Sequence, residues 1–180
     1  MATYLLDTDV LSELMSTPRL TRRRNIEAWL RSLGGEAVVL SSVSIAEINR
    51  GAALVKNRVI AASIRNGLDQ ITSIYDDAII TPSHEEWQTF ARLSAVPELR
   101  RLCHGKNKKN LPRTGADGFL AIQAVTIRCA IATCNAADFA LIDRHLPIIG
   151  GIVNPATGAW IREPDAADEG DCPDYTETSG

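Results

Sequence analysis

Four acidic residues occupy positions at which α/β proteins commonly bind metal ions. Asp7 directly follows the apolar run YLL, and Asp138 follows the run IATC. Glu47 lies in the first turn of a helix expected after VVLSS, and Asp117 opens the helical segment GFLAIQAVTI. In a parallel sheet such positions converge beyond the carboxyl ends of the strands. Clustered carboxylates repel one another unless a cation lies between them, and oxygen-only sites favour Mg²⁺ or Mn²⁺ over zinc. The acids therefore predict a divalent-metal site.

Each of these acids also has an ordinary structural explanation. Asp7 is placed to cap a helix, and Asp138 is placed to stabilise a turn. Glu47 completes an S-x-x-E capping box with Ser44, and Asp117 suits the positive end of a helix dipole. These explanations account for each acid singly. They do not account for four acids, in this order, on elements whose ends are expected to meet.

The elements that must position the acids alternate between strand-like and helix-like segments. This alternation is typical of an α/β domain with a mainly parallel sheet. The segments run in pairs: TYLL and VLSELM, VVLSS and IAEINRGAALV, IIT and HEEWQTFARL. Two apolar stripes at helical spacing are expected to face the core. They consist of Ile26, Trp29, Leu30 and Leu33, and of Ile60, Ile64, Leu68 and Ile71.

The second half of the chain contains a long connection and ends in an acidic segment. Residues Pro97 to Arg113 form a polar, basic stretch, and such long connections are often functional. A second capping box, Ser83 with Glu86, predicts the helix start before it. ATCNAADFAL predicts a strand, a turn and a helix, and PIIGGIVNP predicts a last edge strand. We expect one domain over residues 1–160 and a flexible acidic tail over 161–180.

Composition limits the classes of protein to which the chain can belong. At 180 residues, of which 45% are hydrophobic, it can bury one core. The net charge of −3 argues against nucleic-acid binding by bulk charge, so local basic clusters matter more. One cluster is the run Arg22–Arg24, which is expected to be a solvated helix face. The other precedes Asp117 and either holds a phosphate backbone or is an ordinary solvated loop; it consists of Lys106, Lys108, Lys109 and Arg113.

The sequence does not support several other classes of protein. The apolar runs are far too short for a membrane span, and the first residues do not form a leader, so a cytoplasmic location is expected. The four cysteines form no C-x-x-C pair and are expected to be reduced thiols, and the three histidines suggest no catalytic triad. No G-x-G-x-x-G or P-loop motif is present.

The segments around the acids resemble the motif set of PIN-domain toxins, in particular the VapC and FitB-like branch. The similarity rests on YLLDTDVLSEL, SVSIAEINRG, ADGFLAIQAV and TCNAADF, and it runs from about residue 3 to Asn154–Pro155. It implies a PIN-like three-layer α/β fold, with a mainly parallel central sheet flanked by helices, for the nuclease domain over 1–160.

The resemblance also assigns roles to residues. Asp7, Glu47 and Asp117 would be metal ligands, and Asp138 would be a fourth acid that binds a second metal ion or its water. Side chains that would orient these carboxylates are Thr8, Thr133 and Asn135.

This sequence departs from the family pattern at two places. Asp9 stands where many relatives have Asn, and it either adds charge to the site or caps the helix. Cys134 replaces the Arg of a T-R-N motif, which removes a basic side chain that could have contacted RNA.

By resemblance, the protein would be the toxin of a type II toxin–antitoxin system. It would be an Mg²⁺- or Mn²⁺-dependent endoribonuclease that hydrolyses RNA with a metal-activated water and leaves 5′-phosphate and 3′-hydroxyl ends. Its partners would be a cognate antitoxin and a second copy of the chain.

Two alternatives remain open. The segment Asp7-Thr8-Asp9-Val10 also fits a haloacid-dehalogenase-type phosphatase with Asp7 as nucleophile, although no convincing Lys follows Lys109. The other alternative is a non-catalytic RNA- or protein-binding module of the same fold.

Overall fold

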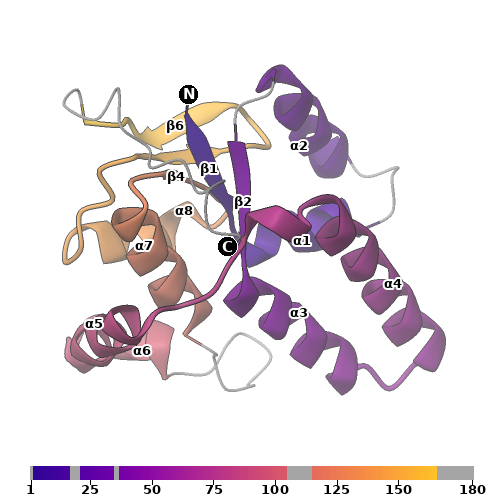
Figure 1. Cartoon of the computed structure of the whole chain (residues 1–180), viewed down its shortest axis with the longest axis horizontal. Coiled ribbons are helices and arrows are strands. Elements are labelled where there is room, and N and C mark those ends of the chain that lie inside the picture. Colours follow the sequence, from indigo (N-terminus) through magenta and orange to yellow (C-terminus); the bar gives the residue numbers. More distant parts are fainter. Residues whose placement is uncertain (1, 17–20, 35–36, 105–114, 166–180) are drawn as a thin grey trace, which may run out of the picture.

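The fold is built on one six-stranded sheet. A computed structural model describes residues 2–16, 21–34, 37–104 and 115–165 (Figure 1). Within them the strand order is β3-β2-β1-β4-β5-β6, and all neighbours are parallel except β5 and β6. The strands are β1 (Thr3–Leu6), β2 (Ala37–Ser41), β3 (Ile79–Ile80), β4 (Ala130–Ala132), β5 (Ile152–Asn154) and β6 (Ala159–Arg162). The predicted mainly parallel α/β sheet is confirmed.

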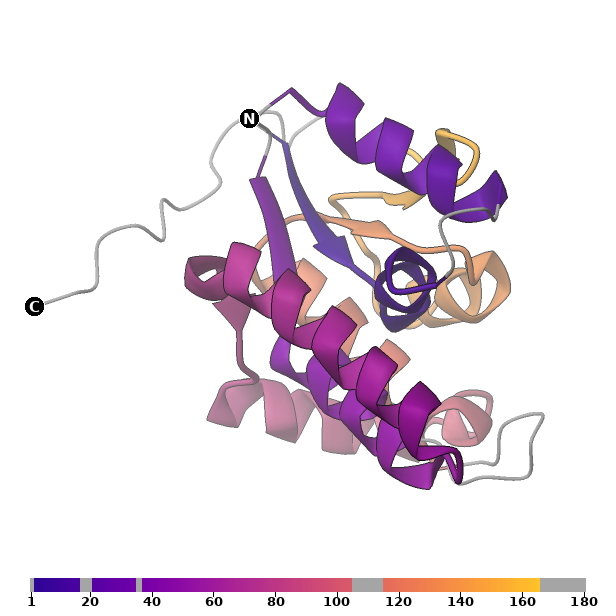
Figure 2. The ribbon, with the colours of Figure 1, turned by 90° about the vertical axis from the view of Figure 1, so that its right-hand side faces the viewer.

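Helices cover both faces of this sheet (Figures 1 and 2). One face is covered by α1 (Thr8–Leu14), α2 (Thr21–Ser32), α3 (Ser42–Leu54) and α4 (Arg58–Ile74). The other is covered by α5 (His84–Ala95), α6 (Arg100–Cys103), α7 (Ala116–Thr126) and α8 (Ala136–Asp143). A short 3-10 helix, η1 (Asp76–Ala78), precedes β3. No helix in the described ranges is long and apolar enough to cross a membrane.

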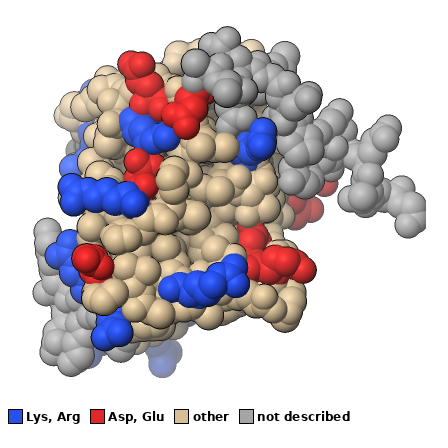
Figure 3. All heavy atoms as spheres, turned by 90° about the vertical axis from the view of Figure 1, so that its left-hand side faces the viewer, with Lys and Arg blue, Asp and Glu red and all other residues tan. Residues whose placement is uncertain are grey.

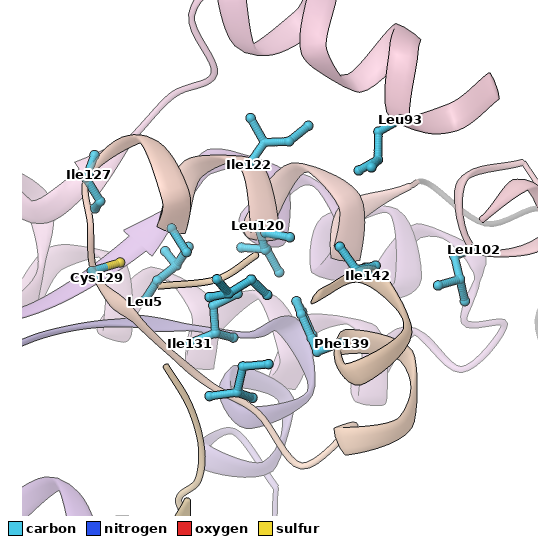
Figure 4. Close-up of a cluster of buried hydrophobic side chains, with 14 of the residues drawn as sticks. Leu5, Leu93, Leu102, Leu120, Ile122, Ile127, Cys129, Ile131, Phe139 and Ile142 are labelled. Carbon is cyan, nitrogen blue, oxygen red and sulfur yellow. The ribbon is translucent and has the colours of Figure 1, made fainter. Parts of the chain in front are cut away.

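The strands divide the hydrophobic core into two halves because their side chains alternate between the two faces. Leu5 of β1 packs with the α5–α8 half, whereas its neighbours Tyr4 and Leu6 pack with the α1–α4 half. Ile131 of β4 joins Leu5 in the first half, where both lie beneath Leu120 of α7 (Figure 4). The sheet is therefore buried on both faces, as a parallel sheet requires.

The parallel order brings the carboxyl ends of β2, β1 and β4 to one edge of the sheet. β1 lies between the other two strands. Helix α1 begins directly after β1, α3 directly after β2, and α8 shortly after β4. Helix α7 runs back toward the start of β4, so its first turn lies at the same edge. Asp7, Asp117 and Asp138 are on these helix starts or strand ends, whereas Glu47 lies in the second turn of α3 and not in its first turn as predicted.

The two predicted capping boxes had different outcomes. The box at Ser83 and Glu86 is present: the Ser83 Oγ accepts the Glu86 N–H at 3.3 Å, and the Glu86 carboxylate accepts the Ser83 N–H at 2.7 Å. The box at Ser44 is wrong. Helix α3 starts three residues earlier, with Ser41 as N-cap accepting the Val43 N–H at 3.1 Å, and Ser44 lies buried inside the helix.

One of the two predicted core stripes extends further than the core does. Ile26 of α2 and Leu68 of α4 are buried as expected. Ile60 is 52% exposed, because it lies in the first turn of α4, beside the exposed end of α3 at Leu54. The apolar periodicity predicted helix α4, but it did not indicate how far the neighbouring helix α3 extends.

The expected edge strand needs correction. Ile152–Asn154 is an inner strand, because β6 adds an antiparallel strand outside it. Residue 160, the expected domain boundary, falls inside β6. Arg162 then ties this strand to the domain: its Nε lies 3.2 Å from Asp143 Oδ1, and its Nη1 donates to the Ile148 carbonyl at 2.6 Å. The division into domain and tail stays a prediction, since residues 166–180 lie outside the described part.

The expected connection from Pro97 to Arg113 is partly helical. It contains α6, whose Leu102 and Cys103 are buried against the core. Residues 105–114, which include the predicted basic loop, lie outside the described residues.

Candidate active site

Asp7 lies at the centre of the site, where β1 ends. The register pairs Leu6 with Ala132, so the next residue along β4, Thr133, comes to lie opposite Asp7. The Thr133 hydroxyl donates to Asp7 Oδ2 at 2.7 Å, and the Thr8 backbone N–H donates to Oδ1 at 2.6 Å. Asp7 is only 2% exposed. It therefore caps α1, as its structural explanation predicted, and also presents a buried carboxylate.

The charge on this carboxylate is poorly compensated by the protein. Burial raises the pKa of Asp7 well above its ordinary value, and the negative charges of Asp9 and Asp117 raise it further. The hydrogen bond from Thr133 only partly opposes this rise. Burial also raises the pKa of Asp9, while the contact with Asp7, the Cys134 N–H and the nearby Arg22 act in the opposite direction. Such a group of acids favours a bound cation or a shared proton.

Asp9 adds an acid to the site and does not cap the helix. Its two carboxylate oxygens accept the Cys134 backbone N–H at 3.1 and 3.3 Å. The capping position of α1 belongs to Asp7. Burial and the charge of Asp9 raise the pKa of the Cys134 thiol to about 11, so this thiol is neutral near pH 7 and is a poor nucleophile.

Asp117 is held in place by tight packing at the start of α7. The N-cap residue Gly115 has a φ of +74°, and a Cβ there would lie 2.6 Å from the Phe90 ring. Glycine suits this position because it tolerates positive φ and leaves room for the ring. Phe90 stacks in turn on Phe119 with ring centroids 4.0 Å apart. The aromatic packing between α5 and α7 thus fixes the helix turn that carries Asp117.

Glu47 is partly buried near the start of α3, and two hydrogen bonds fix that helix relative to its neighbours. The Ser41 hydroxyl donates to Gln123 Oε1 of α7 at 2.6 Å. The Thr8 hydroxyl donates to Ser44 Oγ at 3.1 Å. The Thr8 side chain therefore positions α3, and only its backbone N–H contacts a predicted ligand. Sequence reasoning missed Ser41 and Gln123, although a glutamine inside the apolar helix ADGFLAIQAV was a detectable signal.

Asp138 is connected to Asp7 through a chain of hydrogen bonds. The Asn135 amide donates to Asp138 Oδ2 at 3.0 Å, and the Asn135 backbone N–H donates to the Thr133 hydroxyl at 2.8 Å. Thr133 then donates to Asp7. Asn135 and Thr133 thus contact the two acids that the resemblance said they would orient.

The arrangement has the right donors for a divalent ion but does not enclose one. Asp7, Asp9 and Asp117 interact electrostatically, and Asp138 joins them through hydrogen bonds. Within the described residues, no three His, Cys, Asp or Glu side chains are positioned to hold a metal ion. The donor atoms near Asp7 are carboxylate oxygens, which Mg²⁺ and Mn²⁺ prefer. The site thus fits such an ion in its chemistry.

The described basic residues do not form one continuous patch on the face seen in Figure 3. Blue and red side chains are interspersed there, over the side of the molecule that carries α5 and α6. In the run Arg22–Arg24, Arg23 pairs with Glu27 at 2.7 Å and Arg22 pairs with Glu13 at 3.1 Å, while Arg22 and Arg24 are exposed to solvent. This agrees with a largely solvated helix face.

Comparisons with known proteins show similarity to Toxin FitB and to a solved structure that contains it. No protein-family model matches the chain. The chain is 29% identical to Toxin FitB of Neisseria gonorrhoeae over 140 residues, which cover 77% of this chain and 92% of that protein. The crystal structure of FitAcB from Neisseria gonorrhoeae superposes with a TM-score of 0.60 at 27% identity, covering 84% of this chain and 97% of that chain.

A second solved structure supports the fold alone. VapBC2 from Rickettsia felis, bound to a DNA fragment from its promoter, has a TM-score of 0.53 at 20% identity and covers 81% of this chain and 94% of that chain. The chain thus has the PIN-like fold of FitB and VapC. The predicted resemblance to toxins of the VapC and FitB-like branch is confirmed.

Proposed function

We propose that this protein is a divalent-metal-dependent endoribonuclease and the toxin of a type II toxin–antitoxin pair. The observation that carries the proposal is the buried Asp7 carboxylate, whose pKa is raised by burial and by the adjacent Asp9 and Asp117. A protein gains little from holding three carboxylates together unless a cation neutralises them. Similarity to Toxin FitB over 92% of that protein's length supports the role of a toxin.

The side chains of this chain would have distinct tasks. Asp7, Glu47, Asp117 and Asp138 would hold Mg²⁺ or Mn²⁺. Thr133 supports this arrangement because its hydroxyl donates to Oδ2 of Asp7 and accepts the Asn135 backbone N–H. Residues that orient metal ligands in this way commonly set metal affinity.

The reaction would be hydrolysis of an RNA phosphodiester without a covalent enzyme intermediate. A bound divalent ion would supply a Lewis acid and lower the pKa of an attacking water. The protein's own contribution is to orient the carboxylates and to bind the RNA backbone next to them. The expected products carry 5′-phosphate and 3′-hydroxyl ends.

The proposed partners follow from the same similarity. FitAcB and VapBC2 are named as complexes of two different proteins. We therefore propose a cognate antitoxin as the partner of this chain and a homodimer as its own assembly, both acting in the cytoplasm. Light scattering of the purified chain, alone and coexpressed with the protein encoded beside it, tests both partners.

The test of the activity is digestion of total RNA by the purified full-length chain. Cleavage should require Mg²⁺ or Mn²⁺, should stop with EDTA, and should leave ends that a 5′-phosphate-dependent ligation can capture. Asp117→Asn should abolish cleavage and relieve growth arrest in cells that express the chain. The matched control is Asp69→Asn, which changes an exposed acid on α4.

Three outcomes would contradict the proposal. Absence of metal-dependent cleavage would indicate a binding module that has kept the fold. Wild-type cleavage by Asp117→Asn, in a preparation free of contaminating nuclease, would remove this residue from the site. A covalent phosphoaspartate on Asp7 would indicate a phosphatase.

A further inference from the structure

Arg50 on α3 differs from the other basic residues that the structure describes. Three described Lys or Arg residues are partly buried: Arg23, Arg50 and Arg162. Arg23 pairs with Glu27, and Arg162 pairs with Asp143. No acceptor within the described ranges pairs with Arg50. A guanidinium has five N–H donors, so Arg50 keeps donors available for an external acceptor.

The position of Arg50 relative to Glu47 indicates where an external acceptor would bind. The two residues are three positions apart on α3, so their side chains lie on the same side of the helix. One helical turn is about 5.4 Å long, so the backbone of Arg50 lies just under one turn further along α3 than that of the proposed ligand. The stripe of α3 that packs into the fold is a different one. It consists of Ser44, Ile48 and Ala52.

The helix surface next to Arg50 is open. Gly51 follows Glu47 by four positions and is therefore on the same side of α3. It is exposed, and a Cβ added to it would meet no atom within 4 Å. A chain leaving the carboxylates along α3 would find free backbone surface at Gly51 and a positive charge at Arg50.

We infer that Arg50 and the open surface at Gly51 form a binding subsite for an RNA phosphate that neighbours the one being cleaved. This inference rests on the proposed function and adds a specific contact to it. An arginine suits this role because it binds phosphate through two parallel, charge-assisted hydrogen bonds. The acids around Asp7 repel the RNA backbone, so a cation beside them offsets that repulsion on the path of the strand.

The test compares RNA binding by Arg50→Gln and Gly51→Gln with that of the parent. All proteins carry Asp117→Asn, so that a labelled single-stranded RNA remains intact in Mg²⁺. We expect both changes to weaken binding, Arg50→Gln by about tenfold, because each removes or obstructs a phosphate contact. Arg50→Gln should also reduce the slope of log affinity against log salt by about 0.7, the value for one phosphate on a single strand.

The matched control is Arg31→Gln. Arg31 is exposed near the end of α2, which leads to the start of β2 and hence to the opposite edge of the sheet. This control should keep the parent's affinity and salt slope. Calorimetric titration of Mn²⁺ into Arg50→Gln, without Asp117→Asn, should give a metal affinity no lower than the parent's, because Arg50 is proposed to bind RNA and not to hold Glu47.

Several outcomes would overturn the inference. It fails if either Arg50→Gln or Gly51→Gln binds RNA within twofold of the parent, or if the salt slope of Arg50→Gln is unchanged. An equal loss of Mn²⁺ affinity in Arg50→Gln would also refute it, since Arg50 would then act through Glu47. In all these cases the parent still cleaves RNA, whereas a parent chain that neither binds nor cuts RNA would refute the proposed function itself.

Discussion

Asp7→Asn is expected to stabilise the metal-free protein while it abolishes cleavage. The asparagine Oδ1 can keep the 2.6 Å hydrogen bond from the Thr8 N–H, and its amide nitrogen can donate to the Thr133 hydroxyl in place of the present 2.7 Å contact. The same amide can donate to Asp9, so a repulsive carboxyl pair becomes a hydrogen-bonded pair. Relief of this buried charge should raise the free energy of unfolding by about 1–2 kcal/mol at neutral pH.

The pH dependence of this gain has a definite sign. Because the folded pKa of Asp7 is raised above its ordinary value of 3.8, the folded parent binds its proton more tightly than the unfolded chain does. The parent is therefore most stable, on this account, below about pH 4 and loses stability as pH rises through the folded pKa. The advantage of Asp7→Asn should be small at pH 4 and complete above the folded pKa.

Thermal unfolding in EDTA measures the effect. A gain of about 1–2 kcal/mol corresponds to a rise in Tm of roughly 2–8 °C for a domain of this size. Mg²⁺ at about 100 times its Kd should stabilise the parent by about 2.7 kcal/mol and so reverse the order of the two proteins. Asp7→Ala is the control: it removes the helix cap, which costs about 1 kcal/mol, and should be less stable than Asp7→Asn at every pH.

Destabilisation of Asp7→Asn in place of the expected stabilisation would contradict this prediction. If Asp7→Asn in EDTA at neutral pH is destabilised as much as Asp7→Ala, then the Asp7 charge is not a source of strain. The inference that the acids need a cation would then lose its electrostatic basis.

Further predictions concern contacts that support the site and the fold. Thr133→Val removes the hydroxyl that holds Asp7 and should lower Mn²⁺ affinity by about 10–100-fold; an unchanged titration would contradict its orienting role. Arg162→Met should lower the free energy of unfolding by about 1–3 kcal/mol, and an unchanged denaturant midpoint would show that β6 adds no stability. Gly150→Ala places a Cβ 2.3 Å from main-chain carbonyl atoms and should cost about 3 kcal/mol or more. Gly51→Ala, on open helix surface, should instead raise the free energy of unfolding by about 0.5–1 kcal/mol, so equal Tm values for these two variants would contradict the close packing of Gly150 against Cys129.

Local patterns in the sequence predicted most of the elements and the order of the acids. Apolar runs ended where β1, β2 and β4 end, and helical periodicity began where α4 and α7 lie. These features depend on residues close together in the chain, so short segments encode them. The parallel sheet then followed from the alternation of strands and helices, and with it the meeting of Asp7, Asp117 and Asp138 at one edge.

Local patterns failed where a neighbouring element decided the outcome. Ser44 was predicted as the N-cap of α3 because Glu47 completes a capping box with it, but α3 begins directly after β2 and Ser41 is the N-cap. Likewise, Ile60 has the spacing of a core residue, but no other described helix extends far enough to cover it.

The internal geometry of the site was decided by the tertiary structure alone. The pairing of Leu6 with Ala132 brings Thr133 to Asp7 across 126 positions of sequence, and the contact of Asp9 with Cys134 spans 125. No local pattern encodes such contacts, because they depend on which strands become neighbours and in what register. The sequence by itself therefore determined which acids reach this edge of the sheet, whereas strand register and helix packing determined which of them is buried, which are paired, and that Asp9 is one of them.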